Sequence, residues 1–285
     1  MRYGIPPSGA MDQYSYRIGN LLVGNPENLA SLEITLQGLK IEATASVTIA
    51  ITGGDLNPCL NDYSAPQWAP LEMKKGDILH FRWRETGFRA YLAVKGGIDV
   101  PVVLGSRSTF LRGKIGTPLK EGAILCAGEV EDRKPIKWLG LSSEYIPDYL
   151  RRDPIRILVG PQNEYFTAEG LKTFLTCPYK ITSQSDRMAY RMEGPPIEVT
   201  KGPGIISEPI ARGAIQVPAD GQPIILLRDA QVTGGYAKIA TVVAADMDPL
   251  GQMPPGEFIR FEQIEREEAL HLLLESRTRL SMARG

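Results

Sequence analysis

Apolar and polar residues alternate along most of this chain, in short stretches that are separated by turns. In the first half, the two-residue period of a strand with one buried face appears in residues 30–36, 41–51, 78–83 and 88–94. Glycine-containing turns, such as the TGGD of residues 52–55, close these stretches. Strands that follow one another about every ten residues, with turns between them, predict a β-barrel or a β-sandwich.

The second half shows the same organisation. Its predicted strands are residues 155–159, 179–183, 213–217, 224–227, 239–243 and 258–261. Helical periodicity predicts short helices over residues 12–23, 167–175 and 264–274. Asp12 stands where the N-cap of the first of these helices belongs, since an aspartate side chain can accept hydrogen bonds from the first free amides.

A charged, proline-containing stretch joins the two halves, at residues 129–154. Such composition is typical of the segment between domains, because few contacts have to cross it. We therefore place the domain boundary at residues 145/146. The sequence predicts a mainly β protein with an N-terminal domain at residues 1–145, a C-terminal domain at 146–285 and a few short helices.

Composition excludes several classes of partner. The 32 basic and 33 acidic residues nearly cancel, so no basic surplus indicates a nucleic-acid or anionic-membrane surface. No apolar run approaches roughly 18 residues, so no membrane span is predicted, and no signal peptide is apparent. Three widely spaced cysteines form neither a disulfide framework nor a zinc motif. We expect a cytoplasmic protein without nucleic-acid or membrane partners.

Several common catalytic centres are also excluded. The only two histidines, His80 in a predicted strand and His271 among leucines, suit structural roles, so neither a Ser-His-Asp triad nor a metal site is expected. The chain has no P-loop for nucleotide phosphates. Residues 71–75 (LEMKK) faintly resemble a biotin-attachment site, but the Ala-Met-Lys-Met core is missing and Gly76-Asp77 indicates a hairpin turn. We expect no covalent biotin site.

Polar loops carry the candidate functional residues. Candidates for carboxylate or phosphate binding are Arg107, Arg187 and Arg191, because a planar guanidinium matches two oxygens at once. Gln216 and Gln231 are candidates for holding an amide. Candidates for proton transfer are Asp12, Asp229, Tyr236 and Lys238. The further binding candidates are Ser8, Ser15, Arg17, Ser108, Ser185, Tyr190 and Thr233.

Each of these loops has an ordinary structural interpretation as well. Surface arginines form salt bridges, Thr-Gly-Gly forms β-turns, and Asp12 caps a helix. Taken one by one, these interpretations are favoured. Several such loops in a chain that otherwise lacks catalytic residues favour a cleft that binds an anion or an amide.

Four long runs in these loops also resemble a known family: GIPPSGAMDQYSYRIGNLLVGN, GSRSTF, SQSDRMAYRMEGP and SEPIARGAIQVPADGQPIILLRDAQVTGGYAKIATV. They are similar to allophanate hydrolase subunit 2, a carboxyltransferase-like family that includes the C subunit of 5-oxoprolinase and the carboxyltransferase half of urea carboxylase. The resemblance covers almost the whole chain. It implies two cyclophilin-like β-barrel domains with a cleft between them. Members typically begin one strand earlier, so we expect the first strand of the N-terminal barrel to be missing.

The resemblance implies an enzyme activity and partners. We expect the C subunit of an ATP-dependent 5-oxoprolinase, which hydrolyses a cyclic amide, 5-oxoproline, to glutamate. Its implied partners are a KipI-like B subunit, from the allophanate hydrolase subunit 1 family, and a third oxoprolinase subunit, and its implied cofactor is ATP. One alternative is a biotin-dependent carboxyltransferase that acts on urea or a related amide, with biotin on another protein. Another is a non-catalytic antagonist that binds a KipI-like kinase inhibitor.

Overall fold

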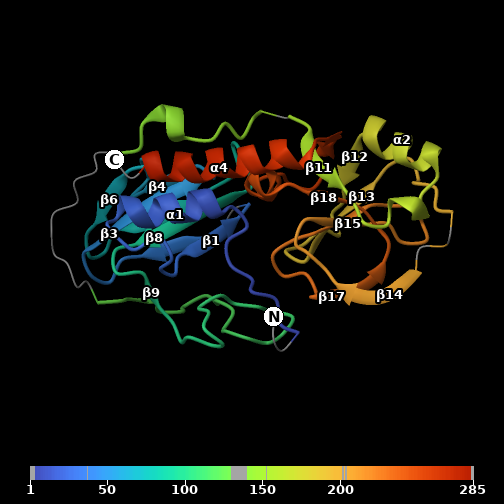
Figure 1. Ribbon diagram of the computed structural model, residues 1–285. Coiled ribbons are helices and arrows are strands. Elements are labelled where there is room, and N and C mark those ends of the chain that lie inside the picture. The colour runs from blue at the N-terminus through green and yellow to red at the C-terminus, as the bar shows by residue number, and fades with distance from the viewer. Residues whose placement is uncertain are drawn as a thin grey trace. The chain divides into compact units, whose positions relative to one another are not determined.

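The computed structural model describes residues 4–36, 38–129, 140–151, 153–200, 202 and 204–283. The chain is mainly β and divides into two compact units, each built around strands (Figure 1). We call Asp12–Arg151 with Arg277–Gly285 the N-terminal unit, and Arg152–Ser276 with Met1–Met11 the C-terminal unit. The division at Arg151/Arg152 lies in the stretch where the sequence indicates a linker.

Each unit includes a terminal segment that the sequence assigns to the other half. Met11 is buried in the main core of the C-terminal unit, which explains why the first residues belong there. At the other end, Ala283 is buried in a core cluster of the N-terminal unit, with Leu280 packed against it. Terminal segments therefore join the unit in which their apolar side chains are buried.

The N-terminal unit contains two antiparallel four-stranded sheets. One has the order β1-β8-β3-β6, formed by Leu32–Thr35, Arg89–Val94, Val47–Gly53 and Pro70–Met73. The other has the order β2-β7-β4-β5, formed by Lys40–Glu42, Ile78–Phe81, Pro58–Leu60 and Tyr63–Ser64. The predicted strand at residues 41–51 is thus two strands, β2 and β3, joined by a turn. Apolar side chains from both sheets, including Ile51, Leu79 and Leu92, share one core.

Helix α1 (Gln13–Leu22) covers strands β3 and β8 of this unit (Figure 1). Ile18 and Leu22 pack with Ala50 and Ala93, whose small side chains let the helix approach the sheet. Strand β3 is therefore buried on both faces, with Ile49 and Ile51 toward one cluster and Ala50 toward the other. The predicted helix at residues 12–23 is confirmed.

Gly53 occupies a position in β3 that no other residue can take without strain. Its φ is +87°, and an added Cβ would lie 2.5 Å from the carbonyl oxygen of Arg89 on the neighbouring strand. We expect Gly53→Ala to lower the free energy of unfolding by about 3 kcal/mol, from backbone strain and overpacking together. The midpoint of urea unfolding measures this effect.

Gly76 provides a matched control, since its φ is +91° but a Cβ there meets open space. Gly76→Ala should cost only about 1 kcal/mol, the strain alone. Equal costs for the two alanine variants would contradict the proposed clash at Gly53.

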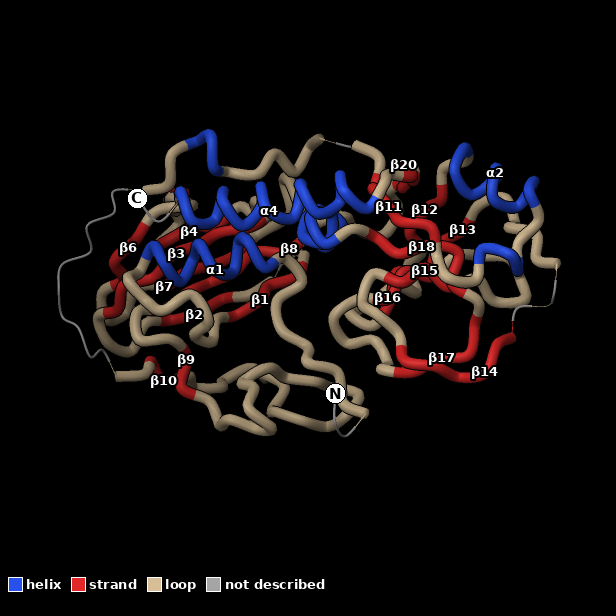
Figure 2. The backbone as a smooth tube through the Cα atoms, viewed as in Figure 1, coloured by secondary structure: helices blue, strands red, loops and turns tan. Residues whose placement is uncertain are grey.

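A long loop connection leaves the sheets of the N-terminal unit between β9 (Ile98–Asp99) and β10 (Cys126–Ala127) (Figure 2). Most of residues 100–125 are exposed, and only the isolated bridges Val103↔Ser106 and Phe110↔Ile115 give this described stretch β pairing. A 3-10 helix at Ser143–Tyr145 follows later in the unit. Strand β10 is short, since it pairs with β9 only through Cys126 and Ala127.

The C-terminal unit is built on one eight-stranded, barrel-like sheet with the order β19-β12-β13-β16-β15-β18-β11-β20. Its strands are Phe258–Ile259, Tyr179–Ile181, Ala189–Glu193, Ile224–Leu226, Ala214–Gln216, Lys238–Val242, Ile155–Val159 and Phe261–Gln263. All neighbours are antiparallel except β11 and β20. A separate two-stranded antiparallel sheet pairs β14 (Gly204–Pro209) with β17 (Thr233–Tyr236).

Helices complete the C-terminal unit. Helix α2 (Ala168–Thr176) packs Phe174 on Tyr179 and Phe261 in the core, and a 3-10 helix at Asn163–Tyr165 precedes it. A 3-10 turn at Ala244–Asp246 leads into helix α3 (Met247–Gly251). Helix α4 (Arg266–Met282) is longer than the predicted 264–274, because its last residues pack in the N-terminal unit.

The predicted mainly β fold is confirmed. No helix in the described ranges has the length and hydropathy to cross a membrane.

Candidate functional site

The loop that opens the chain is fixed in the C-terminal unit by its own backbone conformation and by Arg187. Ser8 has φ +50° and Gly9 φ +92°, a sharp turn that the two preceding prolines pre-set. The Gly9 carbonyl oxygen accepts a hydrogen bond from Arg187 Nη2 at 2.5 Å. Ser8 is 6% exposed, and its Oγ has no hydrogen-bond partner among the described residues. A buried, unsatisfied hydroxyl is costly, so Ser8 is kept as a candidate binding residue.

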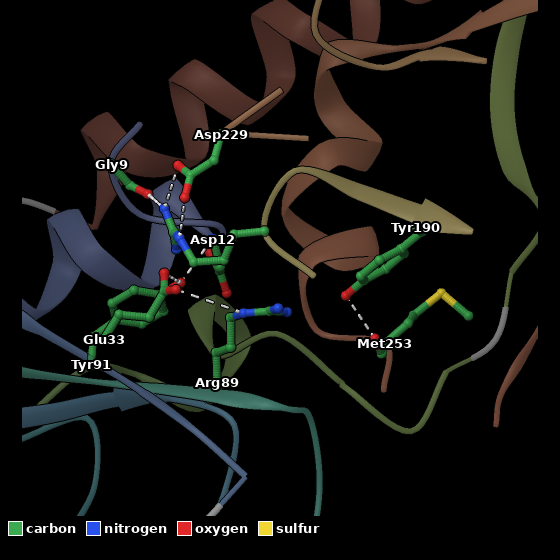
Figure 3. A network of polar contacts seen from close by, with 9 residues as sticks. Gly9, Asp12, Glu33, Arg89, Tyr91, Tyr190, Asp229 and Met253 are labelled. Atoms are coloured by element: carbon green, nitrogen blue, oxygen red, sulfur yellow. Dashed lines mark hydrogen bonds and ion pairs between the residues drawn. The ribbon is translucent and has the colours of Figure 1, made fainter. Parts of the chain in front are cut away.

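Arg187 also joins two of the predicted loops. Its Nε lies 3.0 Å from Asp229 Oδ2 and its Nη2 3.3 Å from Asp229 Oδ1, while the Asp229 amide donates to the Arg187 carbonyl. Figure 3 shows the Asp229 carboxylate and the Gly9 carbonyl turned toward one guanidinium. Three segments distant in sequence therefore converge on one arginine, which forms an ion pair with the buried Asp229.

Lys238 is the second buried charge that the sequence singled out in this unit. Its side chain is 6% exposed, and its ammonium group contacts the Glu208 carboxylate, which is 41% exposed. Gln162 donates from Nε2 to Glu208 at 2.9 Å and accepts from the Lys238 amide at 3.3 Å. The hydrogen bond from Lys238, and then that from Gln162, lower the pKa of Glu208. A depressed pKa keeps the Glu208 carboxylate ionised as the pH falls through the usual range of a glutamate.

The sequence pattern missed Glu208 and Gln162. Gln162 follows the correctly predicted strand β11, whereas Glu208 lies in β14, a strand that the sequence analysis did not predict. Neither stands beside another candidate in the sequence. Lys238 could have indicated such a partner, because a lysine in a strand that is buried on both faces requires a carboxylate nearby. Nearby, buried Gln216 points Nε2 at the Tyr236 carbonyl over 3.5 Å, a weak contact.

In the N-terminal unit, Asp12 is the centre of a buried network. Its Oδ1 accepts from the Ser15 amide at 2.9 Å, which confirms the N-cap, and its Oδ2 accepts from Ser15 Oγ at 2.6 Å and Tyr149 OH at 3.0 Å. The Asp12 amide donates to Tyr91 OH, which donates to Glu33 (Figure 3). Burial, and then the charge of Glu33, raise the pKa of Tyr91.

Removal of the Asp12 carboxylate is expected to destabilise the chain. Asp12→Ala removes the carboxylate that accepts from the Ser15 amide, the buried Ser15 hydroxyl and the partly buried Tyr149 hydroxyl, so the free energy of unfolding should fall by about 2 kcal/mol. Asp12→Asn keeps one acceptor oxygen and should cost less. The midpoint of urea unfolding reports both values, with Thr167→Ala, which removes the N-cap of α2, as the control at about 1 kcal/mol. An Asp12→Ala midpoint equal to that of the wild type would contradict the network.

Other predicted residues lie outside these networks. Arg107 is exposed, where it pairs with Asp99 and the Val100 carbonyl, and the Ser108 amide donates to Ser106 Oγ. Ser185 Oγ bonds the Arg191 backbone, and the Arg191 side chain is exposed. Gln231, Thr233 and Tyr236 are exposed in or beside the β14–β17 sheet, and Arg17 is half-buried on α1. Buried Tyr190 donates to the Met253 carbonyl at 2.8 Å (Figure 3). Their assignment as binding residues stays a prediction.

The described residues bring no three histidine, cysteine, aspartate or glutamate side chains together in a way that could hold a metal ion. Each of the two charge clusters of the C-terminal unit holds one cation against one carboxylate, Arg187 with Asp229 and Lys238 with Glu208. Fixed cations of this kind can stabilise an oxyanion or deliver a proton, which is chemistry that suits an amide or a carboxylate substrate.

Comparisons with known proteins agree on one family. The family described as "Carboxyltransferase domain, subdomain A and B" matches residues 3–263. The 5-oxoprolinase C subunit of Escherichia coli (strain K12) is 41% identical over 94% of this chain and 86% of its own length. That of Haemophilus influenzae is 36% identical over 95% of this chain and 87% of its length. The crystal structure of the K. lactis urea amidolyase superimposes with a TM-score of 0.91 at 31% identity, over 98% of this chain but only 18% of that one.

Proposed function

This chain belongs to the family of carboxyltransferase domains with subdomains A and B, and from this membership we propose that it is the C subunit of an ATP-dependent 5-oxoprolinase. The observation that carries the proposal is the extent of the likeness: the two named C subunits are matched over nearly all of their length. In urea amidolyase the matching region is a small part of a much longer chain. The extent of these matches therefore favours the oxoprolinase subunit.

In this role the chain works in a hetero-oligomer with a KipI-like B subunit and a third subunit. The relatives are named as one lettered subunit of an enzyme, which supports the existence of other subunits. The reaction is the hydrolysis of a cyclic amide, 5-oxoproline, to glutamate. Bound ATP supplies the driving force for opening a ring amide that is otherwise stable in water.

We assign the proton-transfer role in this chain to Lys238. Ring opening needs a proton on the leaving nitrogen, and an ammonium group can provide one. Glu208 and Gln162 hold Lys238 in place, since Glu208 contacts its ammonium group and Gln162 accepts from its backbone amide. The exposed part of Glu208 leaves a route by which the proton is replaced from solvent.

We assign a positioning role to Arg187 and Asp229. The guanidinium is engaged by Asp229 and by the Gly9 carbonyl, so it fixes the Ser8–Gly9 turn and leaves the buried Ser8 hydroxyl to donate to a ligand. A fixed donor of this kind stabilises charge that develops on an amide oxygen. The chain has no P-loop, so phosphate contacts from it would come from arginine side chains.

The test is turnover by the purified protein together with its two partner subunits. The proposal predicts release of ADP and glutamate that depends on 5-oxoproline. The structural match to urea amidolyase favours one second candidate, a biotin-dependent carboxyltransferase acting on urea or a related amide. ATP turnover that ignores 5-oxoproline, but requires bicarbonate, a biotinyl protein and urea, would establish that candidate instead. Tight binding of a KipI-like inhibitor without any turnover would favour the non-catalytic antagonist.

A further inference from the structure

Arg228 is a buried arginine whose charge is poorly compensated. Its side chain is 9% exposed, and its Nε has no hydrogen-bond partner among the described residues. Its one ion pair in the described chain joins Nη2 to Asp248 Oδ1 at 3.9 Å, a separation too long for a hydrogen bond. The adjacent carboxylate, Asp229, is engaged by Arg187 instead. A buried guanidinium normally has several well-formed hydrogen bonds, because its burial is otherwise costly.

A second arginine stands at the same end of the neighbouring strand. Strands β15 and β16 are antiparallel, with Ile215 opposite Ile225, and the Gly213 amide donates to the Leu226 carbonyl at 2.8 Å. Arg212 precedes Ile215 and Arg228 follows Ile225, so the two arginines lie at the same end of the antiparallel strand pair. Partial burial lowers the pKa of Arg212, and the charge of Asp248 opposes that shift.

Asp248 therefore interacts with both arginines, of which Arg228 is buried and Arg212 is exposed. One carboxylate balances only one of two guanidinium groups, so the two arginines at this strand end carry an excess of positive charge. Asp248 is 27% exposed, which weakens the compensation that it can provide. A bound anion with two oxygens would satisfy the planar fork of Arg228 and balance the excess charge.

We propose that Arg228, supported by Arg212, binds an oxyanion of a ligand, either a carboxylate or a phosphate group. The inference deepens the proposed 5-oxoprolinase function, on which the choice of ligands rests: 5-oxoproline carries a carboxylate and ATP carries phosphates. Neither arginine was a candidate from the sequence. Among the arginines that were, Arg187 is engaged within the protein, and Arg107 and Arg191 are exposed.

The first measurement is ligand affinity by calorimetry on the full chain, with 5-oxoproline, ATP and inorganic phosphate as separate titrants. Loss of a charge-assisted bidentate contact should weaken binding of the recognised ligand by about 10- to 100-fold in Arg228→Gln. Arg228→Lys keeps the charge but not the planar fork, so its affinity should lie between that of the wild type and that of Arg228→Gln. The control is Arg260→Gln, an exposed arginine of the same unit.

The affected titrant identifies the source of the oxyanion. A loss confined to 5-oxoproline assigns a carboxylate, and a loss for ATP assigns a phosphate. Weakening of inorganic phosphate alone would indicate an adventitious ion site and overturn the proposal. Unchanged affinities in Arg228→Gln, or no binding of any titrant by the wild type, would also overturn it. Binding that depends on Arg228 in a protein without 5-oxoproline turnover would refute the proposed function but keep the site.

Thermal stability separates a binding role from a structural one. If Arg228 awaits a ligand, Arg228→Met removes a buried, poorly paired charge, and the Tm without ligand should stay the same or rise. If Arg228 instead stabilises the fold through Asp248, the Tm of this variant should fall by several degrees. A fall of that size would overturn the proposal, whatever the calorimetry shows.

Discussion

Lys238→Met is expected to lower turnover by the assembled enzyme about 100-fold or more, the usual contribution of a positioned acid or base. Methionine has a similar length and no charge, so the buried volume around β18 is retained. The partner carboxylate, Glu208, is 41% exposed and becomes solvated when the ammonium group is removed, so the fold should be little affected. A large loss of activity with a small loss of stability is therefore predicted.

The measurement is kcat for 5-oxoproline-dependent glutamate release, beside the midpoint of urea unfolding. Lys180→Met is the matched control, since Lys180 is an exposed lysine on strand β12 of the same unit. Its kcat should equal that of the wild type. A Lys238→Met enzyme with more than about a tenth of the wild-type kcat would remove Lys238 from proton transfer.

Arg187→Ala is expected to abolish turnover and to lower the free energy of unfolding by about 2 kcal/mol. The loss of activity follows from release of the Ser8–Gly9 turn, since the Gly9 carbonyl loses its donor. The loss of stability follows from Asp229, a buried carboxylate left without its cation. The value is at the lower end for a broken buried pair because Arg187 itself is 31% exposed.

A double variant tests this explanation. Arg187→Ala combined with Asp229→Ala removes the unpaired carboxylate, so it should be more stable than Arg187→Ala alone and still inactive. Arg260→Ala, at an exposed arginine of the same unit, should leave both activity and stability unchanged. Near-normal turnover by Arg187→Ala would show that the arginine is not needed to position the first loop.

Local patterns in the sequence predicted helices α1 and α2, part of α4 and many of the strands, but not helix α3 or strand β14. The position of Asp12 just before an apolar stripe predicted helix α1 and its N-cap, because both depend on residues within four positions of each other. The sequence also contains the information needed to predict that Arg191 is exposed, because Arg191 alternates with the buried Tyr190 and Met192 on β13. Its neighbours in the polar run obscured that two-residue period.

The polar networks could not be predicted in the same way, because their members are far apart in the sequence. Lys238 and Glu208 are separated by 30 residues, and the Asp12 amide meets Tyr91 across 79. Which carboxylate neutralises a buried cation depends on strand order and register, which composition and periodicity do not give. The poorly compensated Arg228 was invisible for the same reason: only the folded chain shows that its neighbour Asp229 is used by another arginine.

The most direct test of the central claim is an add-back experiment with the three proposed subunits. The KipI-like B subunit and the third subunit are mixed with ATP and 5-oxoproline, with and without this chain, and glutamate and ADP are followed together. The account predicts that glutamate appears only when this chain is present, and that ADP release rises with it. Glutamate formed equally well without the chain, or ADP release that is indifferent to 5-oxoproline, would contradict the account.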